Sequence, residues 1–224
     1  MKALPAQDPG LYLITDRRLP GGGARGLADA VVKALEAGVR MVQLREKDLE
    51  GRELLEFARL LRAETLRFGA RLIINDRIDV AILSKADGVH LGAASVRPPD
   101  ARLLLGKTSI IGASAHSVQE ALQAEAEGAD FITFGPVYFT GSKARWGKPL
   151  GLDALREVAA RVKMPVYAIG GVNSERINEA LSAGADGVAV ISAVLASADV
   201  SGSALKLVNE LKERRNHQKE GKSL

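Results

Sequence analysis

The chain has 224 residues, of which 46% are hydrophobic and 26% are charged, a composition typical of a globular protein with a sizeable core. Of the net charge of +4, residues 201–224 supply +3 (six Lys and Arg minus three Glu), and aromatic residues make up only 4%, so we predict no role in nucleic-acid binding. The absence of cysteine excludes thiolate chemistry, and the lack of an apolar run long enough for a signal peptide or membrane span leads us to expect a cytoplasmic protein.

Short apolar runs recur along the chain, and most of them follow a turn of small residues. We expect strands at residues 11–15, 41–44, 71–75, 88–91, 109–114, 130–135, 165–171 and 187–192. The stretches between them, such as LADAVVKALEAG and SERINEALSAG, repeat apolar residues at intervals of three and four and close with Gly. That pattern predicts amphipathic helices with a glycine at the C-cap. The turns also resemble one another, as in EAGVRMV, KADGVHL, AEGADFI and SAGADGVAV.

This alternation of strand and helix, repeated eight times, predicts the fold class. Near-continuous apolar strands with helices between them indicate a parallel sheet in an α/β protein. Eight units favour a single (β/α)8 TIM barrel, with an open doubly wound sheet as the alternative. We expect the barrel to cover residues 1–215 and a disordered, polar, basic tail to cover residues 216–224.

The stretch VQLREK, residues 42–47, carries an unusual row of side chains. If it continues as a strand, Gln43, Arg45 and Lys47 share one face, because the side-chain period of a strand is two. A solvated edge-strand face would explain such a row, and so would a site for an anion. In a barrel of this type the active site lies at the carboxyl ends of the strands. Polar residues also gather at the other strand ends, which favours the anion site.

Three further strand ends carry candidate residues. Asn75 and Asp76 follow the third strand, and Asp76 offers the oxygen ligand that Mg²⁺ prefers, although Asn-Asp before a helix is equally consistent with an ordinary N-cap. His90 has an ambiguous direction in its strand, which favours a core or supporting role over catalysis. Ser114 and His116 follow the fifth strand, and His116 fits a helix cap. The sequence has no zinc-ligand spacing and no P-loop.

Two features indicate a phosphate site. Gly170–Gly171 and Ile191–Ser192 follow the last two strands, the common phosphate position in these barrels, where glycine lets backbone N–H groups approach an anion. Residues 135–151 form a loop that is long for a compact domain, and Thr140, Ser142 and Lys143 within it are able to hold phosphoryl oxygens. We interpret the loop as a lid with glycine hinges and a covering Trp146, against the alternative of an ordinary surface loop.

Taken in order, the segments of this chain resemble those of the thiamine-phosphate synthase family. The resemblance extends from LYLITD (11–16) to GVAVISAV (187–194). The shared segments are QLREK (43–47), ND (75–76), GVHLG (88–92), GASAH (112–116), FGPVYFTGSK (134–143), AIGG (168–171) and VIS (190–192). The resemblance implies a barrel-shaped transferase of thiamine biosynthesis. Such an enzyme couples hydroxymethylpyrimidine diphosphate to thiazole phosphate and releases pyrophosphate with the help of Mg²⁺. Its partners would be these small phosphorylated substrates, and the resemblance leaves a homo-oligomer open.

The resemblance also implies roles for individual residues. The pyrimidine diphosphate would contact Gln43, Arg45, Lys47 and Asn75, with Ser114 touching the pyrimidine ring. The thiazole phosphate would contact Thr140, Ser142, Gly171, Ile191 and Ser192. Asp76 would bind the metal, and Lys143 would face the pyrophosphate, so Lys143, Arg45 and Lys47 would be the catalytic cations. Cations placed where the leaving group gains negative charge would stabilise that charge as it forms.

Two positions separate this chain from parts of the wider family. Synthases usually carry G-Q-x-D after the fourth strand, and its Asp is a second magnesium ligand, whereas this chain has GAAS with Ser95 at that place. Relatives that lack this Asp include thiazole tautomerases, but those carry an acid–base His after the glycine of the sixth strand, where this chain has Pro136. We therefore rank a synthase first, a tautomerase acting on thiazole carboxylate phosphate second, and a non-catalytic phosphate-binding barrel third.

Overall fold

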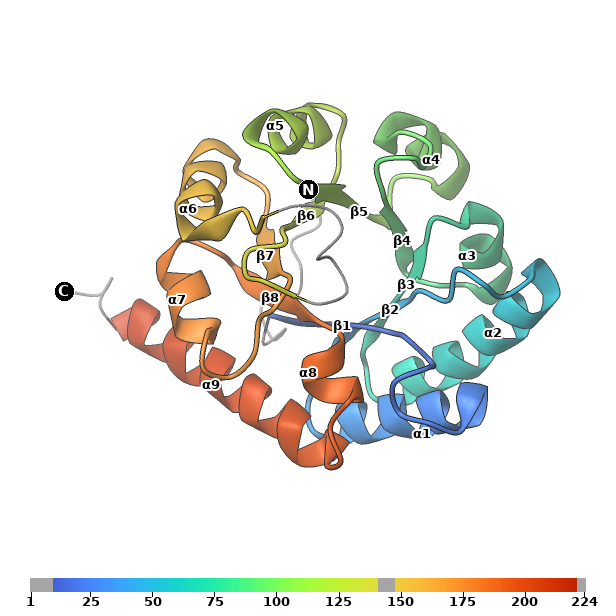
Figure 1. Ribbon diagram of the computed structural model, residues 1–224. Helices are drawn as coiled ribbons and strands as arrows, with labels where there is room; N and C mark the ends of the chain where they lie inside the picture. Colours follow the sequence, from blue (N-terminus) through green and yellow to red (C-terminus); the bar gives the residue numbers. More distant parts are fainter. Residues whose placement is uncertain (1–9, 141–147, 221–224) are drawn as a thin grey trace.

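The computed structural model describes residues 10–140 and 148–220, with side chains up to residue 214, and the strands in it form a closed parallel barrel (Figure 1). Each strand pairs with the next, and β8 pairs with β1, which closes the ring. The TIM-barrel prediction is therefore confirmed, and the open sheet is excluded. The strands are β1 (Leu11–Ile14), β2 (Met41–Leu44), β3 (Arg71–Asn75), β4 (Gly88–Leu91), β5 (Ile110–Ala115), β6 (Phe131–Phe134), β7 (Val166–Ile169) and β8 (Gly187–Val190).

The helices surround the ring of strands (Figure 1). They are α1 (Gly23–Glu36), α2 (Gly51–Arg67), α3 (Ile78–Ser84), α4 (Pro98–Leu105), α5 (Val118–Ala126), α6 (Gly151–Arg161), α7 (Ile177–Ser182), α8 (Ser192–Leu195) and α9 (Val200–Glu220). In α1, Leu27, Val31 and Leu35 recur every four residues and are all buried, so the amphipathic pattern turns one face toward the strands. Helix α9 packs against α1, α7 and α8. It extends to Glu220, so the boundary predicted at residue 215 falls inside a helix.

The strands bury both of their faces, as their nearly continuous apolar sequences predict. One set of side chains points outward into the layer shared with the helices, and the other set fills the barrel interior. The interior set includes Tyr12, Phe131 and Tyr167, whose rings meet edge to face with centroids 5.5–6.0 Å apart. This packed interior leaves the chemistry to the strand ends. Among the described helices, none is long and apolar enough to cross a membrane.

Three aspartates join neighbouring strands at the amino-terminal end of the barrel. Asp87, Asp130 and Asp186, the rim aspartates, directly precede β4, β6 and β8. Their carboxylates accept hydrogen bonds from the backbone N–H groups of Leu72, Ile111 and Val166 at 2.8–2.9 Å. Each rim aspartate also donates its backbone N–H to the backbone carbonyl of its partner on the neighbouring strand, which is Leu72, Ile111 or Val166 respectively. Before β2 the corresponding residue is Arg40, whose side chain bonds the carbonyls of Leu35 and Val39. The recurring Ala-Asp turns of the sequence therefore have a structural cause.

Candidate active site

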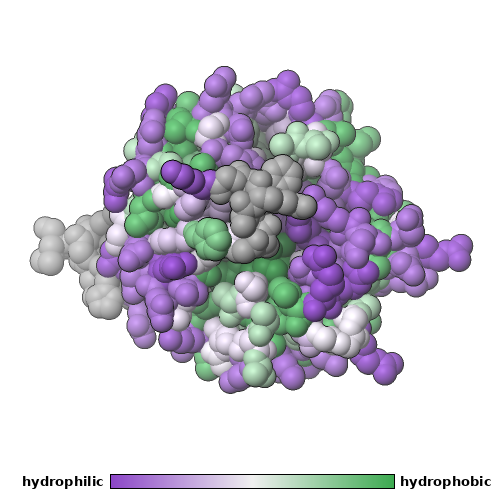
Figure 2. Space-filling model, in the orientation of Figure 1, coloured by the Kyte–Doolittle hydropathy of each residue, from purple (hydrophilic) through white to green (hydrophobic). Residues whose placement is uncertain are grey.

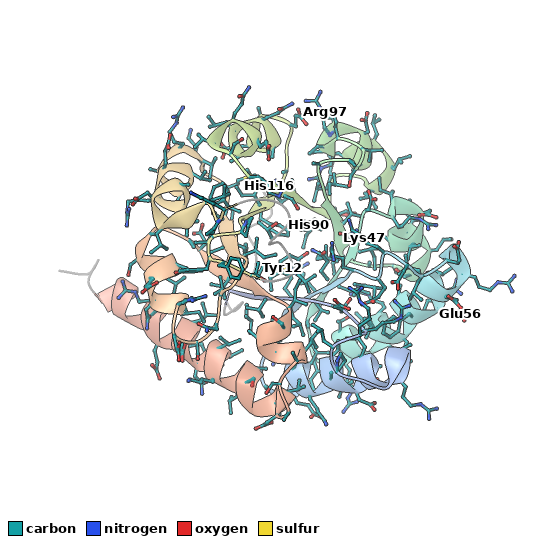
Figure 3. The ribbon with its side chains drawn as sticks, viewed as in Figure 1. Tyr12, Lys47, Glu56, His90, Arg97 and His116 are labelled. Atoms are coloured by element: carbon teal, nitrogen blue, oxygen red, sulfur yellow. The ribbon has the colours of Figure 1, made fainter. Side chains whose placement is uncertain are left out.

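The strand alternation sends one group of polar side chains into the barrel near the carboxyl ends of the strands. The register aligns Asn75 with His90, His90 with Gly112, and Ser114 with Thr133, so these residues lie side by side around the ring. Figure 3 shows Tyr12 and His90 within the ring of strands, whereas Glu56 on α2 and Arg97, just before α4, lie on the outside of the barrel. Gln43, from β2, belongs to this interior group and donates a 2.7 Å hydrogen bond through its amide nitrogen to the Tyr12 hydroxyl. The direction of His90, ambiguous in sequence, is inward.

The row Gln43, Arg45, Lys47 is only partly a strand face. Strand β2 ends at Leu44, and Lys47 lies in the following turn with its side chain exposed, so the predicted alternation does not continue to residue 47. Arg45 remains half-buried and lies close enough to the barrel interior for its charge to lower the pKa of His90. Neither Arg45 nor Lys47 forms an ion pair within the part of the chain that the structure describes. Both positive charges therefore remain available to an anion.

The segment carrying these cations is attached to the end of β1 by two contacts. The backbone N–H of Arg45 donates to the hydroxyl of the buried Thr15 at 2.9 Å. The buried Glu46 carboxylate accepts from the backbone N–H of Arg17 at 3.1 Å and pairs with the Arg17 guanidinium, which also binds Asp48. Because Arg17 engages both neighbouring acids, these acids do not neutralise Arg45 or Lys47.

The Asn75–Asp76 pair is not a helix N-cap. Helix α3 begins at Ile78 with Arg77 at its N-cap position and no side-chain capping bond. Asp76 has a φ of 65°, in the left-handed region that non-glycine residues rarely adopt, and its N–H donates to the carbonyl of His90. Arg77 pairs with Asp79, and no described residue forms a hydrogen bond or ion pair with the exposed Asp76 carboxylate. This carboxylate is therefore free to bind a cation.

Ser95 closes the turn that follows β4. Its hydroxyl accepts a hydrogen bond from the N–H of Gly92 at 2.8 Å, and its own N–H donates to the Gly92 carbonyl. The nearby Asp100 lies in the first turn of α4 and is exposed. Across residues 10–140 and 148–214, no three His, Asp or Glu side chains group closely enough to bind a metal unaided. A magnesium ion at Asp76 would need water and substrate oxygens, an arrangement that this ion commonly accepts.

His90 supports the floor of the site. Its Nε2 lies 3.1 Å from the Ser114 hydroxyl and 3.3 Å from the Thr133 hydroxyl, while its buried Nδ1 has no partner among the described residues. Complete burial, with a smaller contribution from Arg45, lowers the pKa of His90 to about 3. The imidazole is therefore neutral near pH 7 and holds the half-buried Ser114 rather than acting as a cationic acid.

The loop after β6 lies against the Gly170–Gly171 turn. Val137 and Tyr138 donate their N–H groups to the carbonyls of Ile169 and Gly170. Both glycines have positive φ, and a Cβ on Gly171 would lie 2.6 Å from the carbonyl oxygen of Phe139. The glycines are thus required for close packing against this loop as well as for any anion. Thr140 is half-buried at the end of the described loop, whereas Ser142, Lys143 and Trp146 lie outside the described residues.

The last two strands end at Ile169 and Val190, two residues before the predicted ends, and backbone N–H groups follow them. Ile191 is the N-cap of α8, and Ser192 is its exposed first residue. Within the described residues, nothing accepts a hydrogen bond from the N–H of Gly171 or Ser192. Unpaired N–H groups of this kind suit an anionic ligand.

Sequence reasoning missed two residues and assigned one incorrectly. The cap of α5 is Ser117, whose hydroxyl accepts from Glu120 N–H at 3.1 Å, and not His116, which is exposed and contacts Glu120. The two missed residues are Tyr12, whose hydroxyl accepts a hydrogen bond from the Gln43 amide, and Thr133, whose hydroxyl lies beside His90 at the floor of the site. The alternation of side chains along their strands could have indicated both residues. Tyr12 points to the same face as Ile14, and Thr133 to the same face as Phe131, and that face is the barrel interior.

Residues 11–194 match the family described as thiamine monophosphate synthase. A thiamine-phosphate synthase from Moorella thermoacetica is 45% identical over 197 residues, 88% of this chain and 93% of the relative. One from Clostridium novyi is 43% identical over 199 residues, 89% of this chain and 97% of the relative. The solved structure of a thiamine phosphate pyrophosphorylase from Pyrococcus furiosus superposes with a TM-score of 0.84 at 39% identity, covering 92% of this chain and 97% of that one.

Proposed function

Because the chain belongs to the thiamine monophosphate synthase family, we propose that the polar residues at the carboxyl ends of its strands carry out the reaction of that family. The protein is a transferase of thiamine biosynthesis that makes thiamine phosphate from hydroxymethylpyrimidine diphosphate and thiazole phosphate. The proposal concerns how this chain does so. The observation that carries it is the pair of cations Arg45 and Lys47, which form no ion pair with any described residue while their acidic neighbours Glu46 and Asp48 bind Arg17.

The pyrimidine diphosphate is assigned to β2, β3 and β5. The Gln43 amide, oriented by the Tyr12 hydroxyl, and the Ser114 hydroxyl, held by His90, hydrogen-bond the aminopyrimidine ring. Arg45, Lys47 and Asn75 bind the diphosphate oxygens. The apolar barrel interior beneath them excludes water, which strengthens these charge interactions.

Asp76 is the residue that would hold Mg²⁺, and its unengaged carboxylate fits this ion with water and diphosphate oxygens completing the shell. The bound ion would supply positive charge to the diphosphate. Ser95 contributes no carboxylate, and its hydroxyl already accepts from Gly92 N–H. The cations of this chain therefore carry a larger share of the charge neutralisation than a site with two carboxylates would require.

The reaction proceeds by dissociation followed by capture. The bond between the pyrimidine methylene carbon and the diphosphate oxygen breaks, and its electron pair leaves with pyrophosphate. Arg45, Lys47 and Lys143 stabilise the charge that develops on that oxygen. The electron-rich aminopyrimidine stabilises the resulting cation, and the thiazole nitrogen donates its lone pair to form the new C–N bond. No proton moves, so the neutral His90 is consistent with this chemistry.

The thiazole phosphate is assigned to the opposite side of the barrel end. Thr140 and Ser142 from the loop after β6, with Gly171, Ile191 and Ser192, bind its oxygens. The N–H groups of Gly171 and Ser192, which have no acceptor among the described residues, support this assignment. We further propose that the protein acts in the cytoplasm and on small phosphorylated substrates, without nucleic acid or membrane.

The test is to mix both substrates with Mg²⁺ and to measure thiamine phosphate and pyrophosphate together. We expect equal amounts of the two products, and none of either when the thiazole phosphate is omitted. Arg45→Ala should lower turnover roughly 10²-fold, as removal of a charge-stabilising donor typically does. Phosphate-ligand binding without either product would instead favour the non-catalytic barrel.

A further inference from the structure

A cluster of side chains at the start of α7 connects the loop after β6 with the Gly170–Gly171 turn. Arg176 donates through Nη1 to the carbonyl of Gly171 at 2.9 Å, and its guanidinium carbon lies 4.8 Å from the centre of the Tyr138 ring. The Tyr138 hydroxyl reaches the Glu179 carboxylate at 3.1 Å and the Arg176 carbonyl at 3.3 Å. Burial, followed by the contact with Glu179, raises the pKa of Tyr138 to about 12, so this hydroxyl remains a donor at assay pH. We call Tyr138, Arg176 and Glu179 the loop anchor.

The loop anchor determines which way two consecutive peptide groups face. The carbonyl of Gly170 accepts from Tyr138 N–H at 3.0 Å, and the carbonyl of Gly171 accepts from Arg176. In a trans peptide the C=O and the following N–H point in opposite directions. The N–H groups of Gly171 and Val172 therefore point away from the anchor. Neither N–H group has an acceptor within the described chain. Two adjacent unpaired N–H groups form a concave donor site suited to an anion.

We propose that Arg176 is a positioning residue for the thiazole phosphate: it holds the Gly171 peptide so that the N–H groups of Gly171 and Val172 face the phosphoryl oxygens. This inference rests on the proposed function and extends it to a residue that need not touch substrate. The guanidinium is engaged by the Gly171 carbonyl and the Tyr138 ring, so its effect reaches the phosphate through the backbone. Arg176 should thus act on the phosphate half of the reaction and leave the pyrimidine half unchanged.

The experiment compares Arg176→Gln with the wild type, using thiazole phosphate and its unphosphorylated alcohol as alternative acceptors. We expect the KM for thiazole phosphate to rise about tenfold, the size of effect typical of one charge-assisted hydrogen bond. The KM for the pyrimidine diphosphate should stay within about twofold. Activity with the alcohol should not change, so the preference for the phosphate should fall about tenfold. Arg176→Lys retains a donor and should recover part of the loss, and Tyr138→Leu should reproduce part of it.

The matched control is Arg156→Gln, which removes an exposed arginine of α6 that pairs with Asp153 on the same helix. It should leave both KM values unchanged. Equal losses with the phosphate and the alcohol would overturn the positioning role, as would an unchanged KM for thiazole phosphate in an active Arg176→Gln enzyme. If the wild type forms no thiamine phosphate, the proposed function itself fails. A raised KM in Thr140→Ala but not in Arg176→Gln would retain the phosphate site and reject only this inference.

Discussion

Replacing His90 with Gln should remove a pH dependence of stability that the buried imidazole imposes. The folded protein keeps His90 neutral, with its pKa lowered from an ordinary 6.5 to about 3 by burial. The unfolded chain exposes the same imidazole at its ordinary pKa. Below pH 6.5 the unfolded state therefore binds a proton that the folded state excludes. The stabilising contribution is complete above pH 6.5 and is lost as the pH falls from 6.5 toward 3.

The size of the effect follows from the two pKa values. Each pH unit between them changes the free energy of unfolding by about 1.4 kcal/mol for one proton. When the pH falls from 7.5 to 5, protonation of His90 should therefore lower the free energy of unfolding of the wild type by about 2 kcal/mol, and His90→Gln should not show this loss. The carboxylates and the exposed His116 are common to both proteins and cancel in the comparison.

Urea unfolding at pH 7.5, 6 and 5 measures the free energy of unfolding of both proteins. We expect the wild-type curve to fall more steeply in acid, with most of the divergence between pH 6 and 5. Parallel curves would refute the reasoning, because they would mean that His90 protonates equally in both states. An NMR titration of the His90 ring in the folded wild type provides an independent check. A midpoint near 6.5 would also refute it.

The other predictions concern the reaction. Lys143→Ala should lower kcat roughly 10²-fold with little change in the KM for thiazole phosphate, since its interaction would grow in the transition state; equal effects on both would make it a binding residue only. With Pro136 where a tautomerase needs an acid–base histidine, isomerisation of thiazole carboxylate phosphate should be undetectable, and robust isomerisation without thiamine phosphate formation would reverse the ranking. Synthase activity should need an unusually high concentration of Mg²⁺. Ser95→Asp should lower that concentration, whereas Asp76→Asn should raise it or abolish activity. An unchanged requirement in Ser95→Asp, together with a damaged Asp100→Asn enzyme, would instead assign the second ligand to Asp100.

The barrel could be predicted because its signals are local and repeated. Each strand is a short apolar run after a small-residue turn, and eight repeats leave few topologies. Local pattern also placed Asn75 and Ser114 near the ends of their strands, because the apolar runs of β3 and β5 stop there. Strand alternation failed at Lys47 because the strand stops at Leu44, and propensity does not mark that boundary to within a residue or two.

The remaining parts of the site depend on contacts between distant segments. Tyr12 and Gln43 are 31 residues apart, and Thr133 lies 43 residues from His90, so only the closed register brings each pair together. The inward direction of His90 likewise follows from its alignment with Asn75 and Gly112. A glycine pair in sequence indicates either a turn or an anion site. The structure shows that Gly171 packs closely against Tyr138, a contact that the sequence does not reveal.

The rim aspartates have a mechanical consequence. They tie β3 to β4, β5 to β6 and β7 to β8 at the amino-terminal ends, roughly 13–20 Å from the opposite ends of strands that are four to six residues long. The pair β1 and β2 has Arg40 at that place and is tied at the other end, through Thr15 and Glu46. The barrel is thus stiffened beside Arg45 and Lys47, where charge must be held still. The carboxyl ends of β4, β5 and β6 are joined differently, through the contacts of His90 with Ser114 and Thr133.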